Sequence, residues 1–179
     1  MNLLTLPHIK IHNANALSSP YTIGFPAMTA WLGFVHALER KLQQLGCDQL
    51  LFQSVAVVSH HFDLQSYKGP GDFVSSIVGT GNPLDKDGTR SAFIEEARCH
   101  LDVSLVIEFD DPDELTDSEA FAVQLTNLLS TMKIASGDVL SFGSLLIRHV
   151  DETNELEVAK FVQTLMPGYV LIERRELMV

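Results

Sequence analysis

Basic residues are scarce in this sequence of 179 residues, which contains 12 Lys and Arg against 23 Asp and Glu and has a formal net charge of −11. Proteins that hold nucleic acid by its phosphates usually carry a basic patch, so composition alone argues against nucleic acid as a partner. The charge is uneven, however. Residues 1–108 have a net charge of −3 and contain six of the seven histidines, whereas residues 109–179 have a net charge of −8. The first part of the chain is therefore where contact with a polyanion is permitted.

Cysteine is rare as well, and long apolar runs are missing. Cys47 and Cys99 fit no metal-binding or redox spacing, so we expect two free buried thiols and a cytoplasmic protein. The N-terminal MNLLTLPHIK lacks the basic and apolar regions of a signal peptide, and no run approaches the ~20 apolar residues of a membrane span. No contact with a membrane is expected. Hydrophobic residues still make up 46% of the chain, enough for the core of a single domain.

The spacing of apolar residues predicts an alternation of strands and helices. Strands are predicted at 3–12, 50–62, 98–109, 139–142, 145–150 and 169–174, and helices at 28–45, 118–135 and 155–166. Gly46 and Gly137 are expected to end the first two helices, with Thr116 or Asp117 capping the start of the second. Pro7 indicates an edge or a bend in the first strand.

Two of the predicted strand regions carry further information. Residues 50–62 (LLFQSVAVVSHHF) are almost continuously apolar, which predicts that both faces of this strand are covered. His60 and His61 end it, and neighbours on a regular strand point to opposite faces, so we do not expect them to bind one metal ion together. The strands at 139–142 and 145–150 are predicted to be joined by a turn at Gly143 and Ser144.

A polar loop, residues 13–26 (NANALSSPYTIGFP), separates the first strand from the first helix. Its Asn and Ser side chains offer uncharged hydrogen-bonding groups and cannot build an apolar core. The helix that follows is anchored by apolar residues that include Trp31, Phe34 and Leu38. A loop held between a strand and an anchored helix is well placed to present polar groups to a ligand.

Polar and apolar side chains alternate in residues 98–105. Arg98, His100, Asp102 and Ser104 occupy every second position, and apolar residues occupy the positions between them. This pattern predicts a sheet with one apolar and one polar face. The polar row resembles an RNA-reading surface, although a solvated face or a protein interface fits it equally well.

Residues 63–92 form a long segment with five Gly and two Pro. The sequence Gly69-Pro70-Gly71 predicts a hairpin tip. A connection of this length is uncommon in a compact domain unless it has a function, so we interpret it as a functional excursion rather than an inert loop.

Three segments resemble a single family. They are IHNANALSSP through GFVHALER in residues 11–40, NPLDKDGTRSAFIEEARCHLDVSLVI in residues 82–107 and LMPGYVLIERREL in residues 165–177. The family is the subunit that holds the five-prime handle of the guide RNA in type I-F (Csy-type) CRISPR surveillance complexes. The resemblance covers most of the chain, and the segments lie in the same order as in the family.

The resemblance implies an α+β fold: a ferredoxin-like (RRM-type) antiparallel sheet of the RAMP superfamily, with helices on one face and an inserted hairpin thumb. The predicted elements contain the matching order β-α-β-β-α-β. We therefore expect one domain over residues 1–179, with the thumb-like excursion at 63–92 and the family's C-terminal part absent. Two departures from the family are Ile23, where relatives usually have Trp, and a thumb whose residues 63–78 contain only one basic residue, Lys68.

The implied function is that of a non-catalytic subunit of an antiviral, RNA-guided ribonucleoprotein complex (Cascade). Its implied partners are the guide RNA, the large subunit, the backbone subunits and, indirectly, target DNA, with no cofactor and no metal. Transferred by position, the RNA contacts are Asn13, Asn15, Ser18, Ser19, Phe25, His36, Arg40, His60, Lys68, Arg98 and His100. Phe25 could instead be a buried hydrophobe.

Two other functions remain open at this point. Sister proteins on this fold cleave repeat RNA without a metal, which requires a histidine as general base, and His36, His60 and His100 are the candidates. A purely structural interaction module is favoured by the acidic charge.

Overall fold

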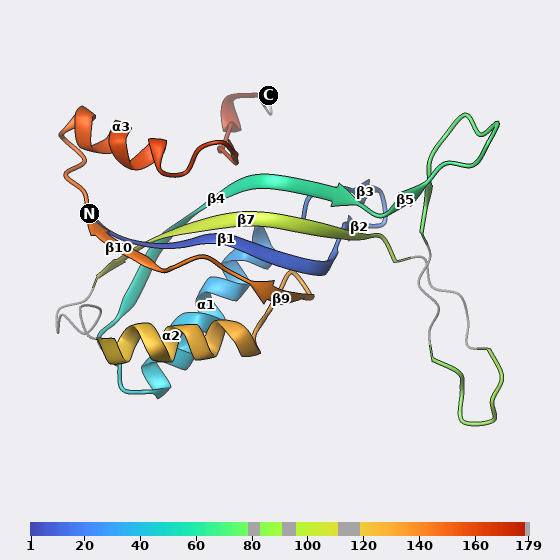
Figure 1. Cartoon of the computed structure of the whole chain (residues 1–179), viewed down its shortest axis with the longest axis horizontal. Coiled ribbons are helices and arrows are strands. Elements are labelled where there is room, and N and C mark those ends of the chain that lie inside the picture. Colours follow the sequence, from blue (N-terminus) through green and yellow to red (C-terminus); the bar gives the residue numbers. More distant parts are fainter. Residues whose placement is uncertain (79–82, 91–95, 111–118, 178–179) are drawn as a thin grey trace.

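An antiparallel sheet of seven strands forms the centre of the protein in our computed structural model, which describes residues 1–78, 83–90, 96–110 and 119–177. Its strands are β1 (Asn2–Asn15), β4 (Leu51–Leu64), β7 (Arg98–Asp110), β8 (Lys133–Ile134), β9 (Gly137–Ser141), β10 (Leu146–His149) and β11 (Tyr169–Val170). They lie in the order β11-β4-β7-β1-β9-β8, and β10 also pairs with β1. The three long strands β4, β7 and β1 cross the molecule side by side (Figure 1).

The first strand, β1, is central in the sheet, so the prediction that Pro7 marks an edge is wrong, whereas the prediction of a bend is confirmed. The register between β1 and β7 shifts between Leu6 and Ile9, and His8 adopts a φ of 48°. The carbonyl oxygen of Pro7 accepts a hydrogen bond from the Gly143 N–H at 2.7 Å. Proline is tolerated in this interior strand because a bulge removes the need for its missing donor.

Gly143 and Ser144 do not reverse the chain between β9 and β10. β9 pairs with residues 10–12 of β1 and β10 with residues 2–5, so both lie end to end along the same side of β1. The two strands therefore form one interrupted antiparallel partner, and the bend between them follows the bulge at Pro7.

Two helices cover one face of the sheet, α1 (Met28–Gln44) and α2 (Glu119–Thr131) (Figure 1). Trp31, Phe34, Leu38 and Leu42 of α1 pack in one core with Phe121, Leu125 and Leu129 of α2 and with the apolar rows of β1 and β7. Leu32, which the sequence places on the apolar face of α1, is 52% exposed. Gly46 follows the end of α1 with a φ of 105°, which confirms the predicted glycine at that end.

The second helix ends at Thr131, so the predicted end near residue 135 and the predicted role of Gly137 as its stop are wrong. Lys133 and Ile134 pair instead with Asp138 and Gly137 in a tight hairpin. Its turn residues, Ala135 and Ser136, have φ values of 48° and 66°, as two-residue hairpins require. A Cβ on Gly137 would lie 2.9 Å from the Ala14 Cα, so this glycine allows β9 to approach β1. The predicted caps, Thr116 and Asp117, lie outside the described residues.

The third helix, α3 (Glu155–Gln163), lies on the opposite face of the sheet, so the prediction of helices on one face is wrong (Figure 1). Phe161 and Leu165 pack there against Leu3, Val106 and Val150. These outward-facing residues are apolar, and the helix removes them from water. Its cap is Asn154, whose side chain accepts hydrogen bonds from two backbone N–H groups. Both α3 and the strand after it are shorter than predicted.

Strand β4 is less covered than its apolar sequence predicts. Of its residues only Val57 and Val58 are fully buried, and Leu51 is 48% exposed. Among the described residues, β11 is the strand on its outer side and pairs with it at Val58 and Ser59, and the Leu171 N–H just after β11 donates to the Val57 carbonyl oxygen. A face close to the margin of the sheet cannot be covered along its whole length by helices that lie over the centre.

Two small hairpins complete the fold. β2 (Leu17–Ser19) pairs with β3 (Thr22–Ile23) inside the polar loop. β5 (Ser66–Tyr67) pairs with β6 (Ser76–Ile77), and this hairpin projects from the end of the sheet (Figure 1). Its connecting residues include Gly69-Pro70-Gly71, with Gly71 at a φ of 89°. None of the helices in the described residues combines the length and apolar character that crossing a bilayer requires.

Candidate nucleic-acid interface

The polar loop is folded back on itself by its own side chains. Asn15 accepts a hydrogen bond from the Leu17 N–H at 3.0 Å and donates one to the Leu17 carbonyl oxygen at 3.2 Å. The Ser19 hydroxyl donates to Thr22 Oγ1 at 2.9 Å and accepts from the Tyr21 N–H at 3.3 Å. Asn15 and Ser19 therefore shape the β2–β3 hairpin in addition to any contact with a ligand.

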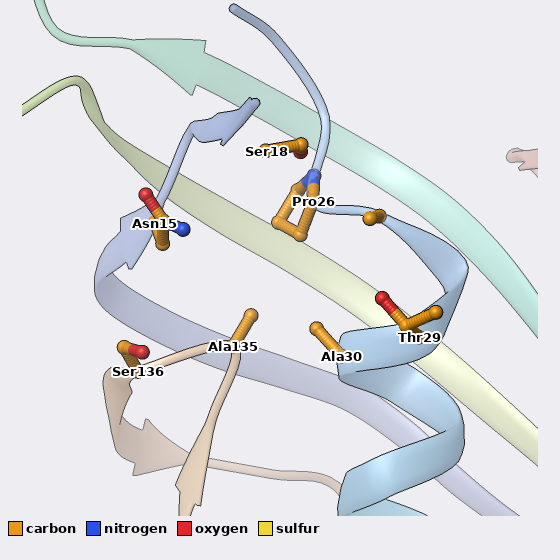
Figure 2. Close-up of a pocket in the computed structure, with 8 residues that line it drawn as sticks. Asn15, Ser18, Pro26, Thr29, Ala30, Ala135 and Ser136 are labelled. Atoms are coloured by element: carbon orange, nitrogen blue, oxygen red, sulfur yellow. The ribbon is translucent and has the colours of Figure 1, made fainter. Parts of the chain in front are cut away.

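A pocket of about 230 Å³ lies between this loop, the start of α1 and the β8–β9 turn (Figure 2). It is lined by Asn15, Ser18, Pro26, Ala27, Thr29, Ala30, Ala135 and Ser136. None of these lining side chains carries a charge. Three segments that are distant in the sequence thus meet at one small polar opening.

The start of α1 is unprotected where it faces this pocket. Its N-cap is Ala27, which has no side chain able to accept a hydrogen bond, and within this fully described helix the first turn has no acidic residue. Backbone N–H groups in the first turn of a helix lack intrahelical partners and favour negative charge. The electrostatics of the pocket wall are therefore neutral to positive, although the chain as a whole is acidic.

The polar row of β7 lies on the open face of the sheet, beside histidines of β1 and β4. His8 stacks on His60 with ring centroids 4.2 Å apart, and His12 stacks on His100 at 4.3 Å. The β1 residues His8, Lys10 and His12 belong to this surface but were not among the predicted contacts. Their signal was present, because they alternate with the buried residues Ile9 and Ile11.

Ser104 ties two of these histidines together. Its buried hydroxyl accepts a hydrogen bond from the backbone N–H of His8 at 3.0 Å and lies 2.7 Å from the ring atom Nε2 of His60. His60 Nδ1 lies 2.7 Å from the Pro167 carbonyl oxygen, which can only accept, so Nδ1 carries a proton. In the neutral ring Nε2 then accepts from Ser104. Both ring nitrogens of His60 are therefore engaged, Nδ1 with the segment after α3 and Nε2 with Ser104 of β7.

His60 and His61 do not point to opposite faces as a regular strand predicts. The register of β4 against β7 shifts between Ser59 and His61. His60 contacts Ser104, and His61 lies opposite Asp102 on the same polar face, because His60 is the extra residue of the bulge between Ser59 and His61. Within the described residues, no group of three or more His, Cys, Asp or Glu side chains is arranged to hold a metal ion.

Arg98 and His100 both contact the backbone of Asn13. The Asn13 N–H donates a hydrogen bond to His100 Nδ1 at 3.2 Å, and Arg98 Nη1 lies 3.4 Å from the Asn13 carbonyl oxygen. Arg98 also forms an ion pair with Glu96. The structure thus brings three predicted contacts together, but through backbone geometry that the sequence did not indicate.

The remaining predicted contacts are not gathered at this place. Phe25 is half-buried and stacks on Trp31 at 5.5 Å, which supports the interpretation of Phe25 as a packed hydrophobe. His36 and Arg40 are exposed on α1, the helix that covers the opposite face of the sheet. Lys68 lies on the projecting β5–β6 hairpin.

Two ionisable groups near the site have shifted pKa values. The hydrogen bond and charge of Lys133 lower the pKa of the Asp138 carboxyl group, to which His12 adds a smaller effect. Burial raises the pKa of the Cys99 thiol to about 11, with a further contribution from Asp63. Cys99 is therefore a core residue rather than a nucleophile, because a thiolate is required for reactivity.

Comparisons with known proteins agree on one family. Residues 4–179 match the family described as "CRISPR-associated protein (Cas_Csy2)". The chain is similar to the "CRISPR-associated protein Csy2" of Pseudomonas aeruginosa (strain UCBPP-PA14), with 35% identity over 188 aligned positions. That similarity covers 98% of this chain and 57% of the relative, so the chain spans somewhat more than half of the relative's length. The chain belongs to the Csy2 family of CRISPR-associated proteins.

Proposed function

We propose that this protein is a non-catalytic subunit of a type I-F CRISPR RNA-guided surveillance complex and that it binds the five-prime handle of the guide RNA. Its further partners in this proposal are the large and backbone subunits of the complex, and it meets target DNA only through the assembly. We expect it to act in the cytoplasm. Membership of the Csy2 family supports the assignment to this complex.

The proposed fold is ferredoxin-like with an inserted thumb. The order β1-α1-β4-β7-α2-β9 is β-α-β-β-α-β, and these four strands lie in the order β4-β7-β1-β9 with antiparallel pairing. The β5–β6 hairpin lies between β4 and β7 in the sequence, where the thumb is expected. Both observations support the proposal of an RNA-recognition domain.

The pocket beside the polar loop is the observation that carries the RNA proposal. At about 230 Å³ it is smaller than the roughly 300–1,000 Å³ of drug-binding pockets, which suits one splayed base or one phosphate rather than a free cofactor. Its amide and hydroxyl groups can donate and accept hydrogen bonds, as recognition of an unpaired base requires. Its uncharged lining permits a polyanion to approach an otherwise acidic chain.

Direct binding of the handle tests this function. Labelled RNA with the handle sequence of the cognate repeat is titrated with the full chain, alone and together with the large subunit, and the products are then analysed for cleavage. We expect retention of intact RNA that is tighter with the large subunit, because neighbouring basic surfaces offset the charge of this chain. Cleaved RNA would establish the endoribonuclease instead. Assembly with the large subunit but no contribution to handle binding would leave a structural module.

A further inference from the structure

We propose that His100 and Arg98 are positioning residues that hold Asn13 in the conformation needed for RNA binding, and that this hold depends on a neutral His100. The inference rests on the proposed function, since it concerns how the polar loop is presented to RNA. It predicts that acid weakens RNA binding, whereas protonation of a histidine near RNA usually strengthens it.

Asn13 is the point at which β1 leaves its regular register and directs the chain into the polar loop. The register with β7 shifts between Ile11 and Ala14, and Asn13 has a φ of 56°. This left-handed conformation is uncommon outside glycine, and although asparagine adopts it more readily than most residues, hydrogen bonds from the surroundings stabilise it further. Two residues further on, Asn15 lines the pocket, and its N–H donates to the Ala135 carbonyl oxygen at 2.8 Å. The backbone at Asn13 therefore determines how one wall of the pocket lies.

Both backbone polar groups of Asn13 are held from β7. The N–H donates to His100 Nδ1 at 3.2 Å, and the carbonyl oxygen lies 3.4 Å from Arg98 Nη1. Of these two contacts, the one with His100 is the shorter and depends on the protonation state of the ring. The contact with Arg98 does not, because guanidinium stays charged throughout the working range.

The direction of the His100 hydrogen bond fixes its tautomer. A backbone N–H can only donate, so Nδ1 must present a lone pair and the ring proton must be on Nε2. A second proton would have to occupy Nδ1, where it would face the Asn13 N–H as one donor against another. Protonation of His100 thus removes the acceptor, leaves the N–H unpaired and repels it. Histidine is the side chain whose charge state responds to mild acid, so a change of pH is the natural test of this contact.

The charges around His100 come from four strands. His12 of β1 stacks on it at 4.3 Å and faces Asp138 across the β1–β9 pair, Arg98 and Asp102 flank it on β7, and Asp63 of β4 lies directly opposite it. Arg98 and a charged His12 oppose a second charge at His100, whereas Asp63 and Asp102 favour it. Whichever balance these groups set, the charged ring cannot accept the hydrogen bond from Asn13.

The experiment follows binding and the loop separately in the full chain between pH 8 and pH 5.5 at constant ionic strength. Handle-RNA affinity is measured by fluorescence anisotropy. Protection of the Asn13 backbone amide is measured by NMR hydrogen exchange and corrected for the intrinsic pH dependence of exchange. For the unmodified chain we expect affinity to fall about fivefold on acidification, the equivalent of one hydrogen bond, and the corrected amide protection to fall with it.

The variant His100→Gln keeps a side-chain acceptor that does not titrate. We expect its affinity to change less than about twofold between pH 8 and pH 5.5, whatever its value at pH 8, because its amide oxygen remains an acceptor at every pH. The matched control is His149→Gln on β10, where the His149 ring contacts Asn2 at the other end of β1 from Asn13, and this variant should keep the full pH dependence.

Several outcomes overturn the inference. They are affinity that stays constant or rises on acidification of the unmodified chain, a pH profile that His100→Gln leaves unchanged, and an Asn13 amide whose corrected protection does not respond to pH. Absence of RNA binding at every pH would contradict the proposed function, and the Asn13 amide would then still decide whether the hold exists.

Discussion

The open face of the sheet has two ends of opposite character, and β1 and β7 run through both. At one end Leu3, Val106 and Val150 are buried under Phe161 and Leu165. At the other end the outward positions of the same strands are polar, and no described helix lies over them (Figure 1). One end therefore resembles a second, small core, and the other is available to a ligand.

The difference arises from single positions along β7. The inward positions are apolar from Cys99 to Phe109 without interruption, whereas the outward ones change from Arg98, His100 and Asp102 to the buried Ser104 and Val106. Apolar outward residues require cover, which α3 supplies, and polar outward residues can remain in water. The apolar outward residue Val106 lies under α3, between Asp102 on one side and Glu108 on the other, so α3 covers only this part of the outward row.

The largest expected effect comes from placing a charge at the α3 end. Val106→Asp introduces a carboxylate among apolar side chains, because Val106 is 7% exposed. We expect the free energy of unfolding to fall by about 3 kcal/mol or more, measured by urea denaturation. The control is Val123→Asp on α2, where the side chain is 55% exposed and the change should be within ~0.5 kcal/mol. Equal losses in the two variants would mean that α3 does not exclude water from Val106.

A smaller loss should follow from loosening α3 without adding charge. Phe161 is half-buried against the outward apolar residues, and Phe161→Ala should lower the free energy of unfolding by about 2 kcal/mol, less than for a fully buried aromatic. Handle-RNA affinity should stay within about twofold, because the loop end does not depend on α3 packing. A parallel loss of affinity would show that the two ends are coupled, with the His60–Pro167 contact as the connecting path.

The alternation of polar and apolar residues along β7 could be predicted from the sequence, since a period of two follows directly from strand geometry. The side chains that lie beside this row could not be predicted, because bulges at Leu6–Ile9, Ile11–Ala14 and Ser59–His61 depend on which strands pair. These bulges bring His8 to His60 and His12 to His100. The prediction identified the polar row but missed the two β1 histidines beside it, of which His12 stacks on His100 of that row and His8 stacks on His60 of β4.

The polar loop was recognised from its composition, but its pocket required tertiary structure. Asn15 and Ser18 were predicted contacts, whereas Ala135 and Ser136 come from a hairpin that the sequence presented as the end of a helix. Alanine and serine favour no left-handed turn by themselves, so the apolar periodicity of α2 extended across them. The wrong helix boundary therefore concealed one wall of the candidate site.

Affinity for RNA should depend on the end of the open face that carries the polar loop. Replacing Asn13 and Asn15 together by Ala should weaken handle binding by roughly 1–3 kcal/mol, because hydrogen bonds in the pocket and in the β2–β3 hairpin are lost. The matched control replaces Asn127, which is exposed on α2, by Ala and should leave affinity unchanged. His60→Ala should cost far less affinity than the double replacement. Similar losses at both places would assign the RNA contact to the histidine face instead.

A weaker effect is expected at Arg98. Arg98→Gln removes the charged contact to the Asn13 carbonyl oxygen, which at 3.4 Å is a long hydrogen bond, as well as the ion pair with Glu96. We expect handle binding at pH 8 to weaken about threefold, less than one full hydrogen bond. Anisotropy titrations at pH 8 measure it. A loss larger than that of the double replacement of Asn13 and Asn15 would mean that Arg98 contacts the RNA itself rather than only holding Asn13.

The smallest expected effect is that of salt on the isolated chain. Lys10 and Arg98 are the basic residues on the loop end of the open face within the described part of the chain, while Lys133 is paired with Asp138. Each phosphate neutralised on single-stranded nucleic acid contributes about −0.7 to the slope of log K against log salt concentration, so two contacts give about −1.4.

At a net charge of −11 the chain also repels RNA at long range, which lowers the association rate. We therefore expect weak binding with a shallow slope for the chain alone, and a steeper slope once basic neighbouring subunits are added. The measurement is a handle-RNA titration from 50 to 300 mM KCl. A slope steeper than about −3 for the isolated chain would mean that RNA also contacts basic residues away from this end of the open face, such as Arg40 and Lys41 on α1 and Lys68 on the β5–β6 hairpin.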